Sequence, residues 1–247
     1  MEWFENEDFW RDFYPFMFSP ERFDTAPEEV TQILELTNPN GAKVLDLCCG
    51  PGRHSVEFAR RGFQVTGVDR SPFLLQKARE HAERASSPIQ WVQQDMREFR
   101  RPESFDLACS LFTSFGYFQN EKDEQQVLNN VFASLAPGGV FIMEMKGKEG
   151  LARSWQDSSV SDCGDGSCVV QRRALTDDCS RVRSDWLLVR EGKVLTHKFD
   201  HFIYSGRELK DLLVRAGFAE VRLYGDFQGS PYGITSPRLV AVARKQA

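Results

Sequence analysis

Residues 44–52 read VLDLCCGPG, and the chain continues to residue 69 as RHSVEFARRGFQVTGVD. An apolar strand that ends in a glycine-rich turn before a helix is typical of a ligand site, because backbone amides at the turn can approach a ligand closely. The dinucleotide fingerprint GxGxxG is incomplete here, since Ser55 stands where the third glycine belongs. The turn therefore predicts a ligand site, and its neighbours must identify the ligand.

The chain from residue 28 to residue 145 alternates helical and strand patterns, which predicts an α/β fold with a parallel sheet. Helices are expected near 27–37, 53–61 and 121–135, the last of which is closed by the turn APGG. A further helix is expected to begin at Ser71, which would cap it. Strands are expected at 43–49, 64–69, 89–95, 105–112 and 140–145. Residues 165–204 alternate without helical periodicity and predict an antiparallel insertion, after which a helix at 205–217 and strands at 219–227 and 238–245 resume the fold.

Composition limits the class of protein and of partner. The 247 residues carry a formal charge of −5, with 41% hydrophobic and 27% charged residues, and no apolar run approaches the roughly 20 residues of a membrane span. The acidic, aromatic N-terminus lacks the basic start of a signal peptide, so a cytoplasmic protein is expected. No run of lysine or arginine is present, which disfavours nucleic acid and favours a small-molecule partner.

The cysteines do not predict a metal site. Six are present, without the CxxC pairs and histidine spacing that zinc requires. Cys48 and Cys49 are expected to be small apolar fillers. Cys163 and Cys168 lie in one loop where a disulfide is conceivable, although a cytoplasmic setting favours free thiols.

Two acidic residues lie at strand ends around the turn. Asp46 is costly inside an apolar strand unless it is paired, so it either accepts the turn amides or faces the ammonium of a bound amino-acid moiety, and the two interpretations stay open. Asp69 ends the next strand, where a carboxylate can accept both hydroxyls of a ribose. The alternative role, capping the following helix, better suits Ser71.

A third acid distinguishes the ligands. Asp95 ends the next strand and can accept the exocyclic amine of adenine, while Met96 and Phe99 offer apolar contact to the ring. Three acidic strand ends predict a pocket for a cation, from which a pyrophosphate would be repelled.

Five segments, in this order and spacing, resemble the class I S-adenosylmethionine-dependent methyltransferases: DLCCGPGRHS (46–55), VTGVDRS (65–71), QQDMREF (93–99), LFTSFGYF (111–118) and LAPGGVFIME (135–144). The resemblance covers residues 28–146 and the closing segment from residue 205. It departs from the common acidic-xGxGxG form at Cys48. The resemblance implies a Rossmann-like sheet of seven strands, the last antiparallel, with helices on both faces and the cofactor at the carboxyl edge.

The family implies a division of the chain and a set of cofactor contacts. Residues 1–26 would form a helical cover, 27–147 and 205–247 the S-adenosylmethionine-binding domain, and 148–204 an antiparallel insertion over the active site. The insertion resembles that of members that methylate amines of small molecules such as glycine or amino sugars. By the same resemblance, the residues expected to bind S-adenosylmethionine, and S-adenosylhomocysteine as product, are Tyr14, Arg22, Asp46, Cys48, Gly50, Gly52, Asp69, Arg70, Asp95, Met96 and Leu111, with Tyr14 and Arg22 at the carboxylate end.

The acceptor side carries no fixed motif, because the reactive group of a methyl transfer belongs to the cofactor. Tyr117 and His201 are candidates to accept or relay a proton, and Thr113 and Ser114 offer polar groups near the acceptor. Residues 225–233, GDFQGSPYG, either line the pocket or turn a hairpin.

The sequence therefore predicts a small-molecule methyltransferase directed at an amine nitrogen. Transfer to oxygen, carbon or a protein, and a cofactor-binding module without catalysis, remain alternatives. A nicotinamide-dependent oxidoreductase is disfavoured, because the third glycine and a phosphate partner are missing.

Overall fold

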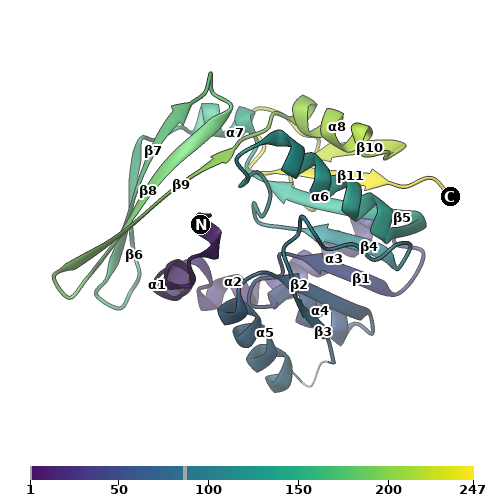
Figure 1. Cartoon of the computed structure of the whole chain (residues 1–247), viewed down its shortest axis with the longest axis horizontal. Coiled ribbons are helices and arrows are strands. Elements are labelled where there is room, and N and C mark those ends of the chain that lie inside the picture. Colours follow the sequence, from purple (N-terminus) through teal and green to yellow (C-terminus); the bar gives the residue numbers. More distant parts are fainter. Residues whose placement is uncertain (1, 86–87) are drawn as a thin grey trace.

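The computed structural model describes residues 2–85 and 88–247, and its centre is a seven-stranded sheet in the order β10-β11-β5-β4-β1-β2-β3 (Figure 1). The strands are β1 (Lys43–Leu47), β2 (Gln64–Asp69), β3 (Gln90–Gln93), β4 (Phe105–Ser110), β5 (Leu135–Met145), β10 (Glu220–Tyr224) and β11 (Leu239–Arg244). β1 pairs in parallel with both β2 and β4, whereas β11 is antiparallel to β5 and β10. The predicted methyltransferase-type sheet is confirmed.

Helices cover both faces of this sheet because strand residues alternate between them. Leu45 and Leu47 join a core beneath α6 (Glu121–Ser134) and α8 (Gly206–Arg215). Val44 joins the opposite core beneath α3 (Ala26–Thr37) and α4 (Arg53–Arg60). Helix α5 (Pro72–Arg84) packs near α4 and the β2–β3 edge.

The helix boundaries follow the predicted caps with one exception. The Ser71 hydroxyl accepts a hydrogen bond from the Leu74 amide at 3.2 Å, and Ser205 forms a capping box with Glu208 at the start of α8. The segment 135–139 was expected to be a turn, but β5 already begins at Leu135, which pairs with Phe105 of β4. Pairing with β4 overrides the local turn signal of APGG.

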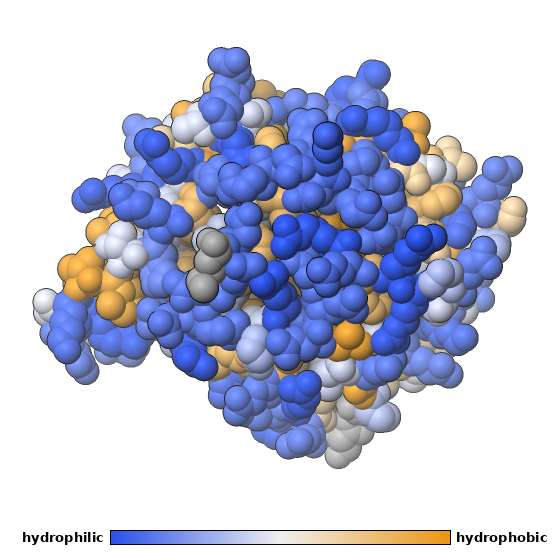
Figure 2. All heavy atoms as spheres, viewed as in Figure 1, coloured by the Kyte–Doolittle hydropathy of each residue, from blue (hydrophilic) through white to orange (hydrophobic). Residues whose placement is uncertain are grey.

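A separate four-stranded antiparallel sheet follows the short helix α7 (Lys148–Arg153). Its strands pair in sequence order: β6 (Ser158–Asp162), β7 (Cys168–Thr176), β8 (Arg181–Arg190) and β9 (Lys193–Phe202). Val169, Leu188 and Phe199 are buried on the inner face, while Val160 and Val194 are among the exposed apolar residues. Figure 2 shows hydrophobic atoms at the left, over the end of this sheet, on a face that is otherwise largely hydrophilic.

The N-terminal segment lies between the two sheets and consists of η1 (Trp3–Glu5), α1 (Glu7–Met17) and α2 (Pro20–Asp24) (Figure 1). Phe9 and Phe13 of α1 are fully buried in one apolar cluster with Val169, Leu188 and Phe199 of the inserted sheet. The insertion therefore obtains its core from the N-terminal helix. Within residues 2–85 and 88–247, no helix is both long and apolar enough to span a bilayer. All six cysteines are free thiols.

Candidate active site

A cavity of about 1190 Å³, including open space at its mouth, lies at the carboxyl ends of β1 to β4. The strand order reverses at this edge, because β1 has β2 on one side and β4 on the other, and such switch points are where α/β sheets bind ligands. The lining comes from residues that follow these strands and from the N-terminal segment, namely 46–51, 68–71, 94–96, 111–114, Trp3, Phe4, Trp10, Met17, Phe18, Arg22, Arg53, His54, Leu74, Tyr117 and Phe118. We call it the first cavity.

The two glycines of the turn have different roles. Gly50 has a φ of +54° and lines the first cavity, where a Cβ would lie 3.4 Å from the Phe18 ring. Gly52 has a φ of +77° and is the N-cap of α4, but it lies outside the cavity lining. A Cβ at Gly52 would lie 2.7 Å from Trp91 and 3.1 Å from Ala78. The structure therefore gives Gly52 a packing role, and the geometry does not support the predicted cofactor contact there.

Asp69, rather than Asp46, holds the turn. Its Oδ2 accepts the Gly50 amide at 2.8 Å, and its Oδ1 accepts the Ser71 amide at 2.9 Å. Asp46 instead accepts the Ser55 hydroxyl at 2.5 Å. Burial raises the pKa of both carboxyls, that of Asp69 to about 6 despite the two amide bonds.

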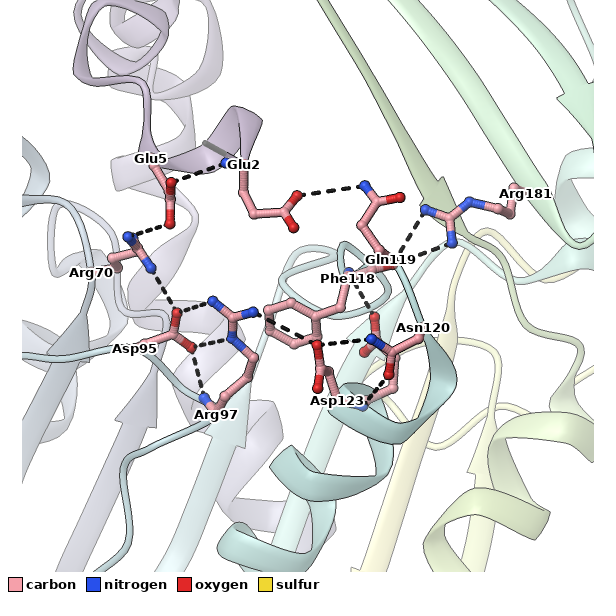
Figure 3. Close-up of polar contacts among 11 residues, drawn as sticks. Glu2, Glu5, Arg70, Asp95, Arg97, Phe118, Gln119, Asn120, Asp123 and Arg181 are labelled. Atoms are coloured by element: carbon pink, nitrogen blue, oxygen red, sulfur yellow. Dashed lines mark hydrogen bonds and ion pairs between the residues drawn. The ribbon is translucent and has the colours of Figure 1, made fainter.

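Asp95 belongs to a charged network made of Glu5, Arg70, Asp95, Arg97 and Asp123 (Figure 3). Its Oδ1 accepts the backbone N (2.8 Å) and Nε (3.0 Å) of Arg97, and its Oδ2 accepts Nη1 of Arg70 and Nη2 of Arg97, each at 2.7 Å. Burial opposes ionisation, but the bonds from Arg97 and Arg70 outweigh it and lower the pKa of Asp95.

This network bears on two predictions. Four hydrogen bonds already reach the Asp95 carboxylate, which lines the first cavity, so an adenine amine would share this acceptor with Arg70 and Arg97. Arg70 lines the first cavity, yet its guanidinium is held by Asp95 and by Glu5 Oε1 at 2.5 Å. The cavity is also less anionic than predicted, because Arg22, Arg53 and Arg70 line it together with the three aspartates.

The two N-terminal candidates for cofactor binding, Arg22 and Tyr14, lie in different places. Arg22 lines the first cavity, and no carboxylate of the described residues lies within 4.0 Å of it in an ion pair. Burial and the nearby Arg238 lower the pKa of Arg22. Tyr14 lies outside the cavity lining, with its ring against Phe18 (centroids 5.3 Å apart) and Phe73 (5.6 Å). The Tyr14 prediction is therefore not supported by the geometry.

One group of site residues was missed by the sequence analysis. Glu29 of α3 accepts Arg53 Nη1 at 2.9 Å and lies 2.7 Å from Nε2 of His54. Arg53 in turn stacks 3.8 Å from the centroid of the Phe112 ring. Arg53 and His54 directly follow Gly52, so the motif contained them, but their partner Glu29 lies 24 residues earlier and gives no local signal.

Glu144 is a second missed residue. It is buried at the end of β5, where Oε2 accepts the Phe112 amide at 2.7 Å and Oε1 lies 3.0 Å from Nη1 of Arg238. Phe112 and Thr113 both have left-handed backbone angles, with φ of +57° and +60°. Glu144 therefore fixes the loop after β4 that faces the cavity. The sequence signal was an acid inside the apolar strand VFIMEM.

A second cavity adjoins the first and lies against the inner face of the inserted sheet. Trp3, Met17, Thr113 and Tyr117 line both cavities. The other lining residues of the second cavity are Phe9, Lys146, Leu151, Ser154, Trp155, Gln156, Gln171, Arg173, Val182, Ser184, Trp186, Phe199 and His201. The predicted proton-relay candidates thus meet at one place, although they come from the main sheet and the insertion.

The Tyr117 and His201 rings lie 5.3 Å apart between centroids. Burial and the nearby Arg181 lower the pKa of His201 to about 4, so its imidazole is neutral at pH 7. His201 Nδ1 is buried and has no hydrogen-bond partner among the described residues. Burial raises the pKa of Tyr117, which keeps the phenol protonated.

Of the remaining residues predicted on the acceptor side, some line the cavities and others do not. Thr113 lines both cavities, whereas Ser114 lines only the first and donates to the Leu111 carbonyl at 2.8 Å. Residues 225–233 line neither cavity. They turn the chain between β10 and β11, where Asp226 Oδ1 accepts the amides of Gln228 and Ser230. Across residues 2–85 and 88–247, no three His, Cys, Asp or Glu side chains are grouped to hold a metal ion.

Comparison with known proteins agrees with this geometry. Residues 44–139 match the family model described as a methyltransferase domain. A crystal structure of an S-adenosylmethionine-dependent methyltransferase from Clostridium acetobutylicum ATCC 824 has the same fold, with a TM-score of 0.79 at 16% identity over 97% of this chain and 98% of that one. The chain is therefore similar in sequence and in fold to S-adenosylmethionine-dependent methyltransferases.

Two proteins of known sequence match most of this chain. YqeM of Bacillus subtilis (strain 168) is 29% identical over 88% of this chain and 90% of its own length. Its name describes it provisionally as a methyltransferase. A protein named glycine/sarcosine N-methyltransferase, from Halorhodospira halochloris, is 28% identical over 87% of this chain and 79% of its own length. The matched regions include the inserted sheet as well as the cofactor domain.

Proposed function

We propose that this protein methylates an amine nitrogen of a small molecule, with S-adenosylmethionine in the first cavity and the acceptor in the second. The observation that carries the proposal is the shared wall of Trp3, Met17, Thr113 and Tyr117. Because these four residues line both cavities, ligands bound in the two cavities would be neighbours, as methyl transfer between them requires.

The donor set of the first cavity fits the cofactor. Asp69 uses one lone pair on each oxygen for the Gly50 and Ser71 amides, which leaves two for the hydroxyls of a ribose. Arg22 offers a cation without a carboxylate partner in the described chain to the amino-acid carboxylate, and Asp46 offers a buried anion to the ammonium. The absent side chain of Gly50 leaves room for the ligand beside Phe18. When bound, S-adenosylmethionine supplies an electrophilic methyl group on a sulfonium.

The chemistry of the second cavity favours nitrogen over oxygen or carbon as the acceptor atom. Its lining includes no Asp or Glu, and Tyr117 stays protonated, so it lacks the strong base that an alcohol or a carbon acid requires. An amine needs only to be held as the free base with its lone pair toward the first cavity. Neutral His201 suffices to receive a hydrogen bond from an N–H group or a released proton.

The relatives support this choice. The Halorhodospira halochloris protein is named for transfer to the nitrogen of glycine and sarcosine, and its match covers 87% of this chain. An inserted sheet over the cofactor domain also suits a small acceptor, because it encloses a hollow rather than a flat surface for a macromolecule.

The test is a two-stage experiment. Calorimetry with S-adenosylmethionine and with NADH establishes the cofactor, and a screen of matched amines, alcohols, phenols and carboxylates then measures S-adenosylhomocysteine production. We expect binding of S-adenosylmethionine alone, turnover with amines, and an N-methyl product by mass spectrometry. Turnover confined to hydroxyl or carbon acceptors, or to proteins, would contradict the nitrogen assignment, and binding of NADH alone would contradict the proposed function.

A further inference from the structure

The second cavity contains two cationic residues and no acidic one. Lys146 and Arg173 line it and do not line the first cavity. The chain as a whole has more acidic than basic residues, 36 against 31. The composition of the protein therefore does not explain why this cavity is cationic. The fold brings these two cations to the cavity and no carboxylate.

Arg173 is held on the inner face of the inserted sheet. It pairs in register with Ser184 of β8, which pairs with Phe199 of β9, and both of these residues line the same cavity. Its Nη2 donates to Oε1 of the buried Gln171 at 2.6 Å, which orients the guanidinium. Burial lowers the pKa of Arg173, and no opposite charge contributes to that shift.

Lys146 enters the cavity from the main domain, directly after β5. Its Nζ donates to the Pro237 carbonyl at 3.3 Å. The adjacent acid, Glu144, is already committed to the Phe112 amide and to Arg238. Within residues 2–85 and 88–247, neither Lys146 nor Arg173 has a carboxylate within 4.0 Å in an ion pair.

We propose that the acceptor carries an anionic group, a carboxylate or a phosphate, that Arg173 and Lys146 bind in the second cavity. This inference rests on the proposed function for the identity of the occupant. The partly buried Arg173 is unfavourable without a counter-ion, and a guanidinium binds carboxylates and phosphates through two parallel hydrogen bonds, while the exposed Lys146 adds a second positive charge at the same cavity. Because both cations line only the second cavity, the anion is bound away from the shared wall, and the amine is left near Thr113 and Tyr117.

The same two cations also affect the nucleophile. A positive charge in the cavity disfavours the ammonium form of a bound amine, which is the form that cannot attack a methyl group. The aromatic side chains of Trp155, Trp186 and Phe199 line the same cavity and offer apolar contact to the body of the acceptor. The occupant predicted is therefore a compact amine with an acidic group at its other end.

The direct test measures anion binding to the full-length protein saturated with S-adenosylhomocysteine. The probes are benzoate, phenyl phosphate and the neutral benzamide, titrated by calorimetry. We expect millimolar or tighter binding of an anionic probe, weakened roughly 10- to 100-fold in Arg173→Gln, with no binding of benzamide. The matched control is Arg172→Gln, which removes the same charge from the exposed residue next to Arg173 and should bind like the wild type.

The choice between benzoate and phenyl phosphate distinguishes a carboxylate acceptor from a phosphate acceptor. Equal binding to wild type and Arg173→Gln, binding of benzamide as tight as benzoate, or no binding of either anion would overturn the inference. Lys146→Gln, at an exposed residue, provides a second variant if Arg173→Gln does not fold, and we expect it to weaken anion binding in the same direction.

A kinetic experiment separates this inference from the proposed function. With amino acids and their primary amides as paired acceptors, Arg173→Gln should raise KM for the acid about tenfold or more and leave KM for the amide unchanged. The dissociation constant of S-adenosylmethionine should not change. Anion binding that depends on Arg173 in a protein that binds no S-adenosylmethionine would contradict the proposed function and leave the anion site supported.

Discussion

Asp69 joins three parts of the site through one carboxylate. It ends β2, accepts the amide of Gly50 in the turn after β1, and accepts the amide of Ser71 at the start of α5. Its side chain is 8% exposed, so both amide bonds are shielded from water. The lone pairs that remain are the ones proposed to receive a ribose, which makes this residue important for both the fold and cofactor binding.

Replacing Asp69 by asparagine should weaken S-adenosylmethionine binding by about 2–3 kcal/mol, because the proposed ribose contact loses its charge and one of its two acceptor oxygens. Calorimetry measures the affinity, and thermal unfolding measures the accompanying loss of stability. Asp106→Asn is the matched control: Asp106 accepts the Lys43 amide at 2.9 Å, at the beginning of β1 and outside both cavities. An unchanged affinity in Asp69→Asn would remove Asp69 from the cofactor site.

The raised pKa of Asp69 also predicts a pH dependence. The pKa of about 6 in the folded protein lies above the ordinary aspartate value of 3.8, so the folded protein binds this proton more tightly than the unfolded chain does. This carboxyl therefore favours folding at low pH, and its contribution is lost as the pH rises toward about 6. Cofactor binding has the opposite trend, because the proposed ribose contact needs the ionised form.

We expect the dissociation constant of S-adenosylmethionine to rise as the pH falls below about 6, by up to about tenfold per pH unit, and to be nearly constant above about pH 7. Calorimetry between about pH 5 and pH 8 measures this curve. In Asp69→Asn the dependence should flatten, while other buried acids such as Asp46 keep their own contribution. A wild-type affinity that is the same at both ends of the range would contradict the prediction.

Among the elements, the turn between β1 and α4 shows how two similar glycines differ. Both have positive φ, but Gly50 faces the first cavity and Gly52 faces Trp91 of β3 and Ala78 of α5. The turn approaches its neighbours so closely because β2 lies directly beside β1, with Gly67 opposite Asp46. Gly67 leaves space for the same tryptophan, whose ring would be 2.4 Å from a Cβ there.

Gly52→Ala is expected to destabilise the protein more than Gly62→Ala does. Both residues have positive φ, +77° and +87°, so each substitution carries a similar backbone strain of about 1–2 kcal/mol. Gly62 has open space around it, whereas an added methyl at Gly52 meets Trp91, which adds about 1–3 kcal/mol. Denaturant unfolding measures the free energy of unfolding of the two variants. Equal losses of this free energy would show that the Trp91 side chain can move aside at little cost.

These elements also show what the sequence can predict. Strand ends and helix caps depend on local patterns, so the sheet, the position of Asp69 and the serine cap at Ser71 were all predictable. The role of Gly52 was not, because Trp91 lies 39 residues away in the chain and reaches the turn only after β3 pairs with β2. The bonds that Asp95 receives from Arg70 depend on the same pairing.

The second cavity was the least predictable part of the site. Its walls come from the N-terminal segment, the loop after β4 and the inner face of the insertion, which are far apart in sequence. Alternation in residues 165–204 indicated a sheet but not which of its faces turns inward. Arg172 and Arg173 look alike in sequence, and only the register, which sets Arg173 beside Ser184 and Phe199, separates the exposed residue from the cavity residue.

At the scale of the whole molecule, the N-terminal segment is attached on two sides by different interactions. Phe9 and Phe13 bury apolar rings against the inserted sheet. On the other side, Glu5 is joined to Arg70, and through it to Asp95, in the charged network of Figure 3. Trp3 of the same segment stacks on Phe199 of the inserted sheet and lines both cavities. Release of a ligand from the first cavity therefore depends on how firmly this segment is held.

Glu5→Gln should speed the release of S-adenosylmethionine without greatly changing stability. The Glu5 and Arg70 side chains are 24% and 38% exposed, so their ion pair contributes about 1 kcal/mol or less, which corresponds to at most about a fivefold faster dissociation. Stopped-flow fluorescence can follow release, because Trp3 and Trp10 line the first cavity. High salt should accelerate release from the wild type and narrow its difference from the variant.

Arg11→Gln is the control for this prediction. Arg11 also belongs to the N-terminal segment, but it pairs only loosely with Asp8, at 3.7 Å and with both side chains largely exposed. Its loss should change dissociation much less than Glu5→Gln does, since its contact with the main domain is a largely exposed guanidinium 5.7 Å from the centroid of the Phe73 ring. If Arg11→Gln accelerates release as much as Glu5→Gln, the ion pair of Glu5 with Arg70 is not the specific attachment that slows release. A Glu5→Gln rate equal to the wild-type rate at low salt would mean that the aromatic contacts with the inserted sheet hold the segment by themselves.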